Sequence, residues 1–384
     1  MILHVSINWI TTALTAFTEC IGLGHQPDSF HHCSGTSKHQ NTYRQRNMIR
    51  EESKGMDAHK FTSLWENIVS SFVSLAKATT LLGPGLSWLF YHAHTLWLFN
   101  YSDLKTIVIP KTSFALIALL SNPRSPTSAP HSTLALLPRC ICPSLMWTWL
   151  NLLPLSMCNQ FREGDVDEDR QNKPWRPIPA GRITVTQTKY LMMASYMTAI
   201  LASIYLGGLL ECCALVFEGW VYNEVGAAND NLLARNLLNA LGYMTFAAGA
   251  VKVACIQAET RLSSDFHLWM VLLAAVVATT IQFQDLYDQA GDRLRGRQTM
   301  PLLVGDTRTR VTIGLAVMVW SLVCPTFWRL DARGFVLQVS LAVIIVGRLY
   351  CYRTVKADKV SFKVWNVWIV ALYALPFIKK IIEH

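Results

Sequence analysis

The sequence predicts an all-α fold, that of a polytopic membrane protein with about nine transmembrane helices. Its mean hydropathy is +0.27, which is high for a soluble domain. Only 15% of the 384 residues are charged, and the chain contains 13 tryptophans. Apolar runs of about 17 to 25 residues recur along the chain, and a run of that length can cross a bilayer as a helix. Lipid is therefore the expected surrounding of most of the chain.

Nine apolar segments account for the predicted spans. They are 104–122, 143–158, 187–206, 207–222, 236–255, 265–284, 310–328, 334–353 and 364–379. Pro154 lies in the second span and is expected to kink it, because proline lacks the N–H that a helix interior uses. The stretch 187–222 is too long for one crossing at about 1.5 Å per residue. We therefore divide it at Gly207 and Gly208.

Basic residues collect in the loops after the second, sixth and eighth spans. They are Arg162, Arg170, Lys173, Arg176, Arg182, Arg293, Arg295, Arg297, Arg308, Arg353, Lys356, Lys359 and Lys363. The positive-inside rule places these loops in the cytosol. An odd number of spans then leaves the N-terminus in the cytosol and His384 across the membrane. This topology accounts for most of the net charge of +9, and no basic–aromatic motif indicates a nucleic-acid partner.

Two regions differ from the membrane-spanning pattern. Residues 1–60 mix a short apolar run with a polar stretch and are predicted to be an N-terminal extension. This extension is either disordered or a gene-model artefact, with translation starting at Met56. The segment 121–144 is rich in proline and serine, which predicts either a lumenal loop or a second artefact. A signal peptide is not favoured, because the N-terminus lacks a basic n-region and a small-residue cleavage site.

An acidic stripe follows the sixth span, in the segment "QDLYDQAGDRLRGRQTMPLLVGD". Asp285, Asp288 and Asp292 are spaced i, i+3 and i+7, which places them on one face of a helix. Three neighbouring carboxylates repel one another unless a cation neutralises them. Mg²⁺ takes oxygen ligands, usually one or two carboxylates together with phosphate oxygens and water. The stripe therefore predicts a site for a Mg²⁺-bound diphosphate.

A second acidic cluster follows the second span, in "NQFREGDVDEDRQNKPWRPIPAGR". Asp165 and Asp169 are four residues apart and would share a helical face. The cations near the two clusters are candidate ligands of the diphosphate: Lys173, Arg176, Arg182, Arg293 and Arg297. Metal and cations together stabilise the charge that develops on a leaving diphosphate. Because a lipid tail would lie among apolar helices, the predicted substrate is an isoprenyl diphosphate.

Both acidic segments resemble the Asp-rich motifs of the UbiA superfamily of intramembrane prenyltransferases. "DRQNKPWRPIPAGRIT" is similar to part of the first motif, and "DLYDQAGDRLRGRQTMPLLVG" is similar to the second. The resemblance covers roughly residues 90–384 and implies a nine-helix bundle that opens laterally to the bilayer, with Mg²⁺ bridging the motifs to the diphosphate. The metal-site residues that it implies are Asn159, Asp165, Asp169, Asp285, Asp288 and Asp292. Among them, the catalytic residues implied are Asp165, Asp169, Asp288 and Asp292.

The first motif departs from the family pattern, in which an asparagine is followed by acids four and eight residues later. Counting back from "NKPWRP" selects Asp165 and Asp169 but puts Phe161 in the place of the asparagine. Counting forward from the asparagine of "NQ" selects Glu163 and Asp167 instead. The downstream match is longer, which favours Asp165 and Asp169, with the extra pair of residues as a bulge or a splice error.

Three functions remain open on the sequence. The first is a Mg²⁺-dependent prenyltransferase of terpenoid secondary metabolism, which transfers a farnesyl or geranylgeranyl cation to an acceptor. The second is a UbiA-type terpene cyclase that captures the cation intramolecularly; the wording "EDRQNKPWRP" resembles fungal-type cyclases of the superfamily. In both, the rings of Tyr243 and Tyr287 are candidates to stabilise the cation, although packing in the bundle is the favoured role of Tyr243. A transporter is less favoured, because the acids lie at helix ends and no internal repeat is visible.

The expected partners are the isoprenyl diphosphate and the lipid bilayer. Neither a nucleic acid nor an obligate protein partner is expected. The expected location is the endoplasmic reticulum or another endomembrane, with both acidic motifs on the cytosolic side.

Overall fold

The computed structural model of the chain describes residues 84–122 and 130–383. The expectations for residues 1–60, including a start at Met56, lie outside the described residues. Every regular element within these ranges is a helix, which confirms the all-α fold. Contacts divide the chain into two units, the larger of which includes all residues from Thr95 to His384. In the smaller unit the described part is residues 84–94, the first turns of α4 (Pro84–Asn100).

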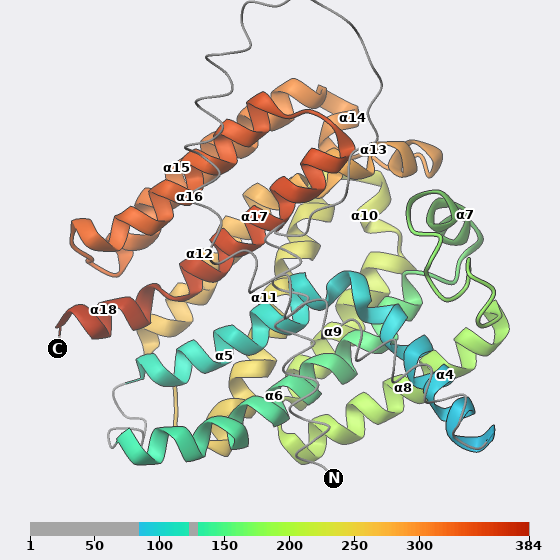
Figure 1. Cartoon of the computed structure of the whole chain (residues 1–384), viewed down its shortest axis with the longest axis horizontal. Helices are drawn as coiled ribbons and strands as arrows, with labels where there is room; N and C mark the ends of the chain where they lie inside the picture. The colour runs from blue at the N-terminus through green and yellow to red at the C-terminus, as the bar shows by residue number, and fades with distance from the viewer. Residues whose placement is uncertain (1–83, 123–129, 384) are drawn as a thin grey trace, which may run out of the picture. The chain divides into compact units, whose positions relative to one another are not determined.

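From Thr95 onward the chain forms a bundle of long helices joined by short helices and turns (Figure 1). The long helices are α5 (Ile109–Ser121), α6 (Pro130–Cys158), α8 (Val185–Leu206), α9 (Leu209–Asn223), α11 (Leu232–Gln257), α12 (Ser264–Thr280), α15 (Asp306–Phe327), α16 (Ala332–Cys351) and α17 (Val355–Tyr373). A last helix, α18 (Leu375–Glu383), follows α17. Each long helix overlaps a segment that the sequence predicts to span the membrane.

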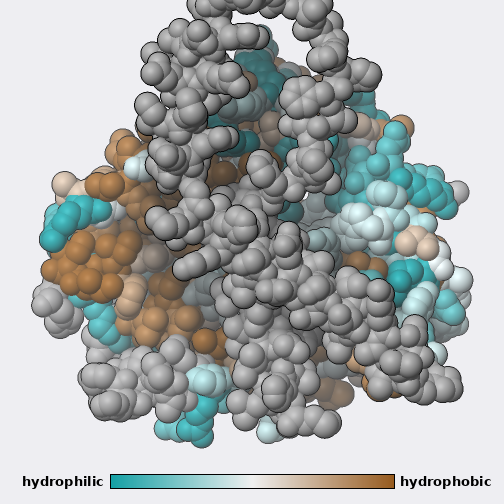
Figure 2. Space-filling model, in the orientation of Figure 1, coloured by the Kyte–Doolittle hydropathy of each residue, from teal (hydrophilic) through white to brown (hydrophobic). Residues whose placement is uncertain are grey.

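The helices identify an integral membrane protein. By length and composition, five helical stretches among the described residues can cross a membrane, or six if the bent pair of α17 and α18 is one span. Large apolar side chains lie on the outside of the bundle, such as Tyr205 and Leu210 at 89% and 80% exposure. Figure 2 shows hydrophobic residues at the left of the view, where α15 ends, α16 begins and α18 lies. The count of nine spans stays a prediction, because α9 has only 15 residues and α6 contains three internal prolines.

Two predicted boundaries are wrong. Residues 130–144, which the sequence places in a loop, form the first half of α6, and this helix continues through Pro154. Pro130 begins the helix, where a missing N–H costs little because the first turn has no intrahelical acceptor for it. The last long helix begins at Val355 instead of 364, so three lysines predicted to lie in a loop are on its surface: Lys356, Lys359 and Lys363.

A buried ion pair explains the early start of α17. The Arg310 guanidinium donates to both carboxylate oxygens of Asp358 at 2.7 Å, and both side chains are almost fully buried. Arg310 also binds Asp306, one turn earlier on α15. The polar first turn of α17 is therefore held against α15 by a bidentate pair, although its composition is that of a loop.

The predicted division at Gly207 and Gly208 is confirmed, since α8 ends at Leu206 and α9 begins at Leu209. Both glycines have positive φ, 92° and 80°, which other residues adopt only with strain. A Cβ on Gly208 would lie 2.9 Å from the indole nitrogen of Trp147, which is fully buried in the core. The two glycines thus allow both the chain reversal and the close packing of α9 on α6.

Candidate active site

The two acidic segments form short helices that pack on each other. The first is α7 (Glu163–Asn172), which follows α6, and the second is α13 (Asp285–Leu294), which follows the 3-10 turn η4 (Ile281–Phe283). Gly291 on α13 permits the contact, because a Cβ there would lie 2.3 Å from the Asn172 amide nitrogen and 2.8 Å from Glu168 Cγ. Motifs more than a hundred residues apart in sequence therefore lie side by side.

Ion pairs connect the two helices. Arg295, just after α13, pairs with Asp165 of α7. Arg297 binds Asp292 at 3.0 Å and Glu168 at 3.2 Å, and so bridges the two motifs as well. These side chains are mostly buried, so the pairs lie in a medium of low dielectric, where they are less screened than on the surface.

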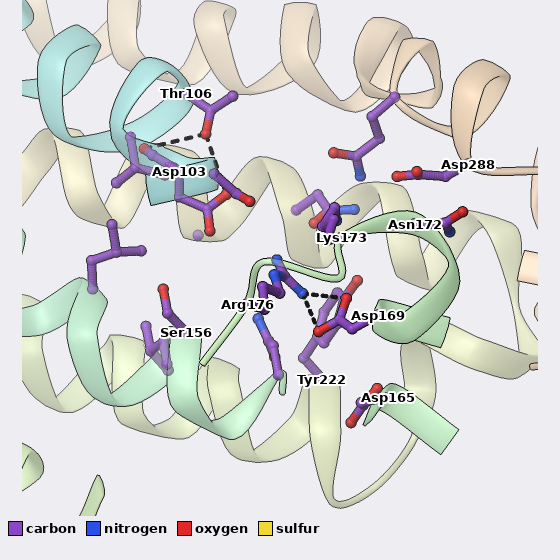
Figure 3. A pocket seen from close by; sticks show the side chains of 18 of the residues that line it. Asp103, Thr106, Ser156, Asp165, Asp169, Asn172, Lys173, Arg176, Tyr222 and Asp288 are labelled. Carbon is purple, nitrogen blue, oxygen red and sulfur yellow. Dashed lines mark hydrogen bonds and ion pairs between the residues drawn. The ribbon is translucent and has the colours of Figure 1, made fainter. Parts of the chain in front are cut away.

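Two further arginines bind Asp169 and Asp285. The Arg176 guanidinium donates to both oxygens of Asp169 at 2.8 Å, a contact visible in Figure 3. Arg235, near the start of α11, donates to Asp285 at 3.1 Å. Of the predicted acids, Asp165, Asp169, Asp285 and Asp292 thus each have an arginine partner.

Burial governs the protonation of the carboxyl groups. It raises the pKa of Asp165, Asp169 and Asp288, which all lie outside the membrane-spanning segments. Burial also raises the pKa of Asp285 to about 6; Arg235 opposes this shift and the charge of Asp292 adds to it. A cation close to any of these groups favours the ionised form. The site is therefore suited to bind positive charge.

A cavity of about 680 Å³ opens between α7, α13 and the long helices. The predicted residues that line it are Asn159, Asp165, Asp169, Lys173, Arg176, Asp288 and Arg297. Asp285 and Asp292 are buried and are not among the lining residues. Arg182 donates to Thr95 at 3.1 Å, and Arg293 is exposed, so the structure does not bring either side chain into the cavity lining.

The two ways of counting the first motif place different residues at the cavity. Asp165 and Asp169, selected by counting back from "NKPWRP", are 3% and 2% exposed and line it. Asp167, selected by counting forward, points to solvent and pairs with Arg170, and both side chains are at least 60% exposed. Asp165 and Asp169 thus face the cavity, whereas Asp167 does not.

Sequence reasoning missed several charged residues of the cavity wall. Arg235 and Glu168 form ion pairs with the motifs, and Lys359 faces the cavity from α17. Asp103 and Glu218 line it from the first span and from α9. Within the described residues, these two are the only lining acids outside α7 and α13. The sequence identified Lys359 only as a basic residue beside the membrane. Its place in the cavity wall depends on contacts between distant segments.

The donor set fits a hard divalent cation that is completed by phosphate. Among residues 84–122 and 130–383, no three His, Cys, Asp or Glu side chains lie close enough to hold a metal by themselves. Asp165 Oδ2, a buried carboxylate oxygen of the cavity lining, has no hydrogen-bond partner among the described residues, and neither has Asp292 Oδ2 behind the wall. Mg²⁺ usually takes one or two carboxylates and fills its remaining positions with phosphate oxygens and water. The residues present can supply that share of the ligands.

The fold and the cavity define a class of protein: an integral membrane enzyme whose cavity joins a charged mouth to an apolar and aromatic wall. The chain belongs to the UbiA prenyltransferase family, which matches residues 111–370. The resemblance seen in the two motifs is thereby confirmed. Members of the family are prenyltransferases or terpene cyclases, and this chain is an enzyme of that class.

Relatives and solved structures agree with the assignment. The chain is 26% identical over 289 residues to the fumagillin beta-trans-bergamotene synthase af520 of Aspergillus fumigatus, a match that covers 75% of this chain and 93% of the relative. It is 26% identical over 258 residues to the diterpene cyclase eriG of Hericium erinaceus, covering 66% of this chain and 74% of the relative. A solved digeranylgeranylglyceryl phosphate synthase aligns with a TM-score of 0.50 at 14% identity, covering 74% of this chain and 97% of that one. At this identity the structural likeness shows the fold alone.

Proposed function

We propose that the chain is a Mg²⁺-dependent enzyme that ionises an isoprenyl diphosphate of the farnesyl or geranylgeranyl class in this cavity. The observation that carries the proposal is the set of ion pairs between the motifs, in which Arg295 binds Asp165 and Arg297 binds both Glu168 and Asp292. A ligand that brings both a metal and phosphate oxygens offers a new partner to the acid and to the arginine of each pair.

Each group of the cavity mouth has a role in this proposal. Asp165, Asp169 and Asp288 would hold the metal, with Asn159 beside them in the lining. Bound Mg²⁺ would stabilise the charge on the departing diphosphate. Cations of the wall would bind the phosphate oxygens: Lys173, Arg176 and Arg297. Asp285 and Asp292, which lie behind the wall, would fix the orientation of Arg235 and Arg297.

When the C–O bond of the substrate breaks, its electron pair leaves with the diphosphate and an allylic cation remains. Seven aromatic side chains line the cavity, and four of them are Tyr243, Phe246, Tyr287 and Phe362. Aromatic ring faces attract a cation without forming a bond to it. The wall can therefore stabilise the cation while limiting its reaction with protein groups.

Intramolecular capture is the first candidate for the fate of the cation, in which a double bond of the same chain attacks it. It is supported by the aromatic wall and by the relatives, one of which is named a bergamotene synthase and another a diterpene cyclase. The chain would then be a membrane terpene cyclase.

Transfer to a separate acceptor is the second candidate, and one observation favours it. Glu218 of α9 and Asn239 of α11 both line the cavity. Glu218 Oε2 and the Asn239 amide nitrogen are buried without hydrogen-bond partners among the described residues. Such a pair could bind the hydroxyl group of an acceptor, because a hydroxyl both donates and accepts.

One assay tests the function and separates the candidates. Membranes that contain the protein are incubated with Mg²⁺ and farnesyl or geranylgeranyl diphosphate, without any acceptor, and both diphosphate and extracted products are measured. Hydrocarbon products identify a cyclase, and prenylated products that form only after an aromatic acceptor is added identify a transferase. Failure to release diphosphate under either condition would contradict the proposed function.

The proposed location is the endoplasmic reticulum or another endomembrane, with the cavity mouth in the cytosol.

A further inference from the structure

The first membrane span is interrupted where it meets the cavity. After α4 ends at Asn100, the backbone forms a 3-10 turn, η1 (Tyr101–Asp103), and a π turn, η2 (Leu104–Val108), before α5 begins. Pro110 explains the wider turn, since a proline cannot donate to the carbonyl four residues earlier and its ring crowds that carbonyl. Irregular backbone is tolerated at membrane depth where it is buried in protein or lines a cavity, and π turns are frequent at functional sites.

Asp103 lies at this interruption and lines the cavity (Figure 3). The Thr106 hydroxyl contacts its carboxylate at 3.5 Å, at the limit of a hydrogen bond. Tyr243 and Tyr287 line the same cavity as Asp103. A weakly held carboxylate thus shares the cavity with two of the aromatic rings that would surround the cation.

We propose that Asp103 is the catalytic base that ends the reaction by taking a proton from the carbocation. This inference rests on the proposed function. After C–C bond formation, a C–H bond next to the cationic carbon breaks and its electron pair forms a C=C bond. The proton goes to the Asp103 carboxylate and passes to water when the product leaves. The same step serves both candidates, because an alkylated aromatic ring also loses one proton to regain its aromaticity.

Position and bonding distinguish Asp103 from the other proton acceptors. Glu218 Oε1 accepts a hydrogen bond from Thr245 at 2.7 Å, so one of its oxygens is already engaged. The departing diphosphate would be held by metal and arginines, which lower its basicity. Asp103 has neither a strong hydrogen bond nor an ion pair among the described contacts of the chain. Its carboxylate is therefore less engaged by hydrogen bonds than that of Glu218.

The test compares diphosphate release with product identity. Asp103→Asn removes the basic oxygen with little change in shape, and Ser156→Ala is the matched control, a small buried residue of the same cavity wall. We expect Asp103→Asn to release diphosphate at the wild-type rate in a single turnover. We expect formation of the normal product to fall about 100-fold, the usual contribution of a general base. Alcohols from water capture, or isomeric alkenes, should take its place, while Ser156→Ala keeps the wild-type products.

Other outcomes would overturn the proposal. Unchanged products from Asp103→Asn would assign the proton to another acceptor, and a change confined to Glu218→Gln would identify that acceptor as Glu218. Loss of diphosphate release in Asp103→Asn would show a role in ionisation instead. If wild type itself releases no diphosphate, the proposed function fails before this question arises. If Asp103→Asn does not fold, the variants Asp103→Glu and Thr106→Val test the proposal instead. Each should shift the ratio of products. Wild-type product ratios in both variants would contradict the proposal.

Discussion

Arg295 and Asp165 are 130 residues apart in sequence and form an ion pair across the two acidic motifs. The exposed fractions of their side chains are 16% and 4%, so neither partner can exchange the other for water. The pair makes α7 and α13 one structural unit, and the position of the first motif depends on the second.

Arg295→Ala should therefore destabilise the protein and abolish turnover. Removing one partner of a buried pair costs about 3–5 kcal/mol, because the other charge stays buried without compensation. Thermal unfolding in detergent and diphosphate release measure the two effects. The double variant Arg295→Met, Asp165→Asn should regain stability but not activity, since no unpaired charge remains.

The matched control for this prediction is the exposed pair of Arg170 and Asp167. Arg170→Ala should change stability by about 1 kcal/mol or less, as is usual for surface ion pairs. An equal loss of stability in the Arg170 and Arg295 variants would show that burial does not determine the strength of these pairs.

Asp288→Asn should stop diphosphate release while the protein remains inserted in the membrane. The carboxylate lines the cavity and is proposed to hold the metal, whereas membrane insertion depends on the apolar helices. Alkaline extraction of membranes checks insertion, and a phosphate-coupled assay checks turnover. Asp167→Asn is the control and should retain activity; normal turnover in Asp288→Asn would contradict the metal site.

Gly291→Ala should separate the two motif helices. Its new Cβ would lie 2.3 Å from the Asn172 amide nitrogen and 2.8 Å from Glu168 Cγ, so these side chains of α7 must shift or the helix must move. We expect the Mg²⁺ concentration for half-maximal activity to rise and turnover to fall. Gly164→Ala, on α7, is the control, because its nearest neighbour would be Arg295 Nε at 3.9 Å. A wild-type Mg²⁺ dependence in Gly291→Ala would show that close packing of the helices is not needed.

Protease access in sealed microsomes should show the sidedness of the site. The basic loops predict a cytosolic first motif, so a tag at Gly181 should be cleaved and a tag after His384 protected. Protection of the Gly181 tag would contradict the predicted orientation. Cleavage of both tags would show that an even number of spans lies between them.

Sequence patterns predicted the features that depend on local spacing. Asp165 and Asp169 share a face because four residues make about one helical turn, and the pair of glycines at Gly207 and Gly208 marked a break between helices. Features that depend on contacts between distant segments were not predictable. Arg235 is 50 residues from its partner Asp285, and no local pattern joins them.

The first half of α6 and the start of α17 were mispredicted for a related reason. Proline-rich or charged segments favour loops in isolation, but packing in the bundle overrides this preference. Arg310 supplies that packing for α17, and its partner is 48 residues away.

Pairing most of the motif acids with arginines leaves these carboxylates close to electrical balance before any ligand arrives. Free Mg²⁺ would meet carboxylates that are already compensated, and a metal-free diphosphate would draw the arginines away and leave carboxylates alone. Each ligand is expected to bind weakly by itself and to raise the affinity of the other by the same factor, as linkage requires. The enzyme would thus admit its substrate as a neutralised complex and discriminate against other anions that carry no metal.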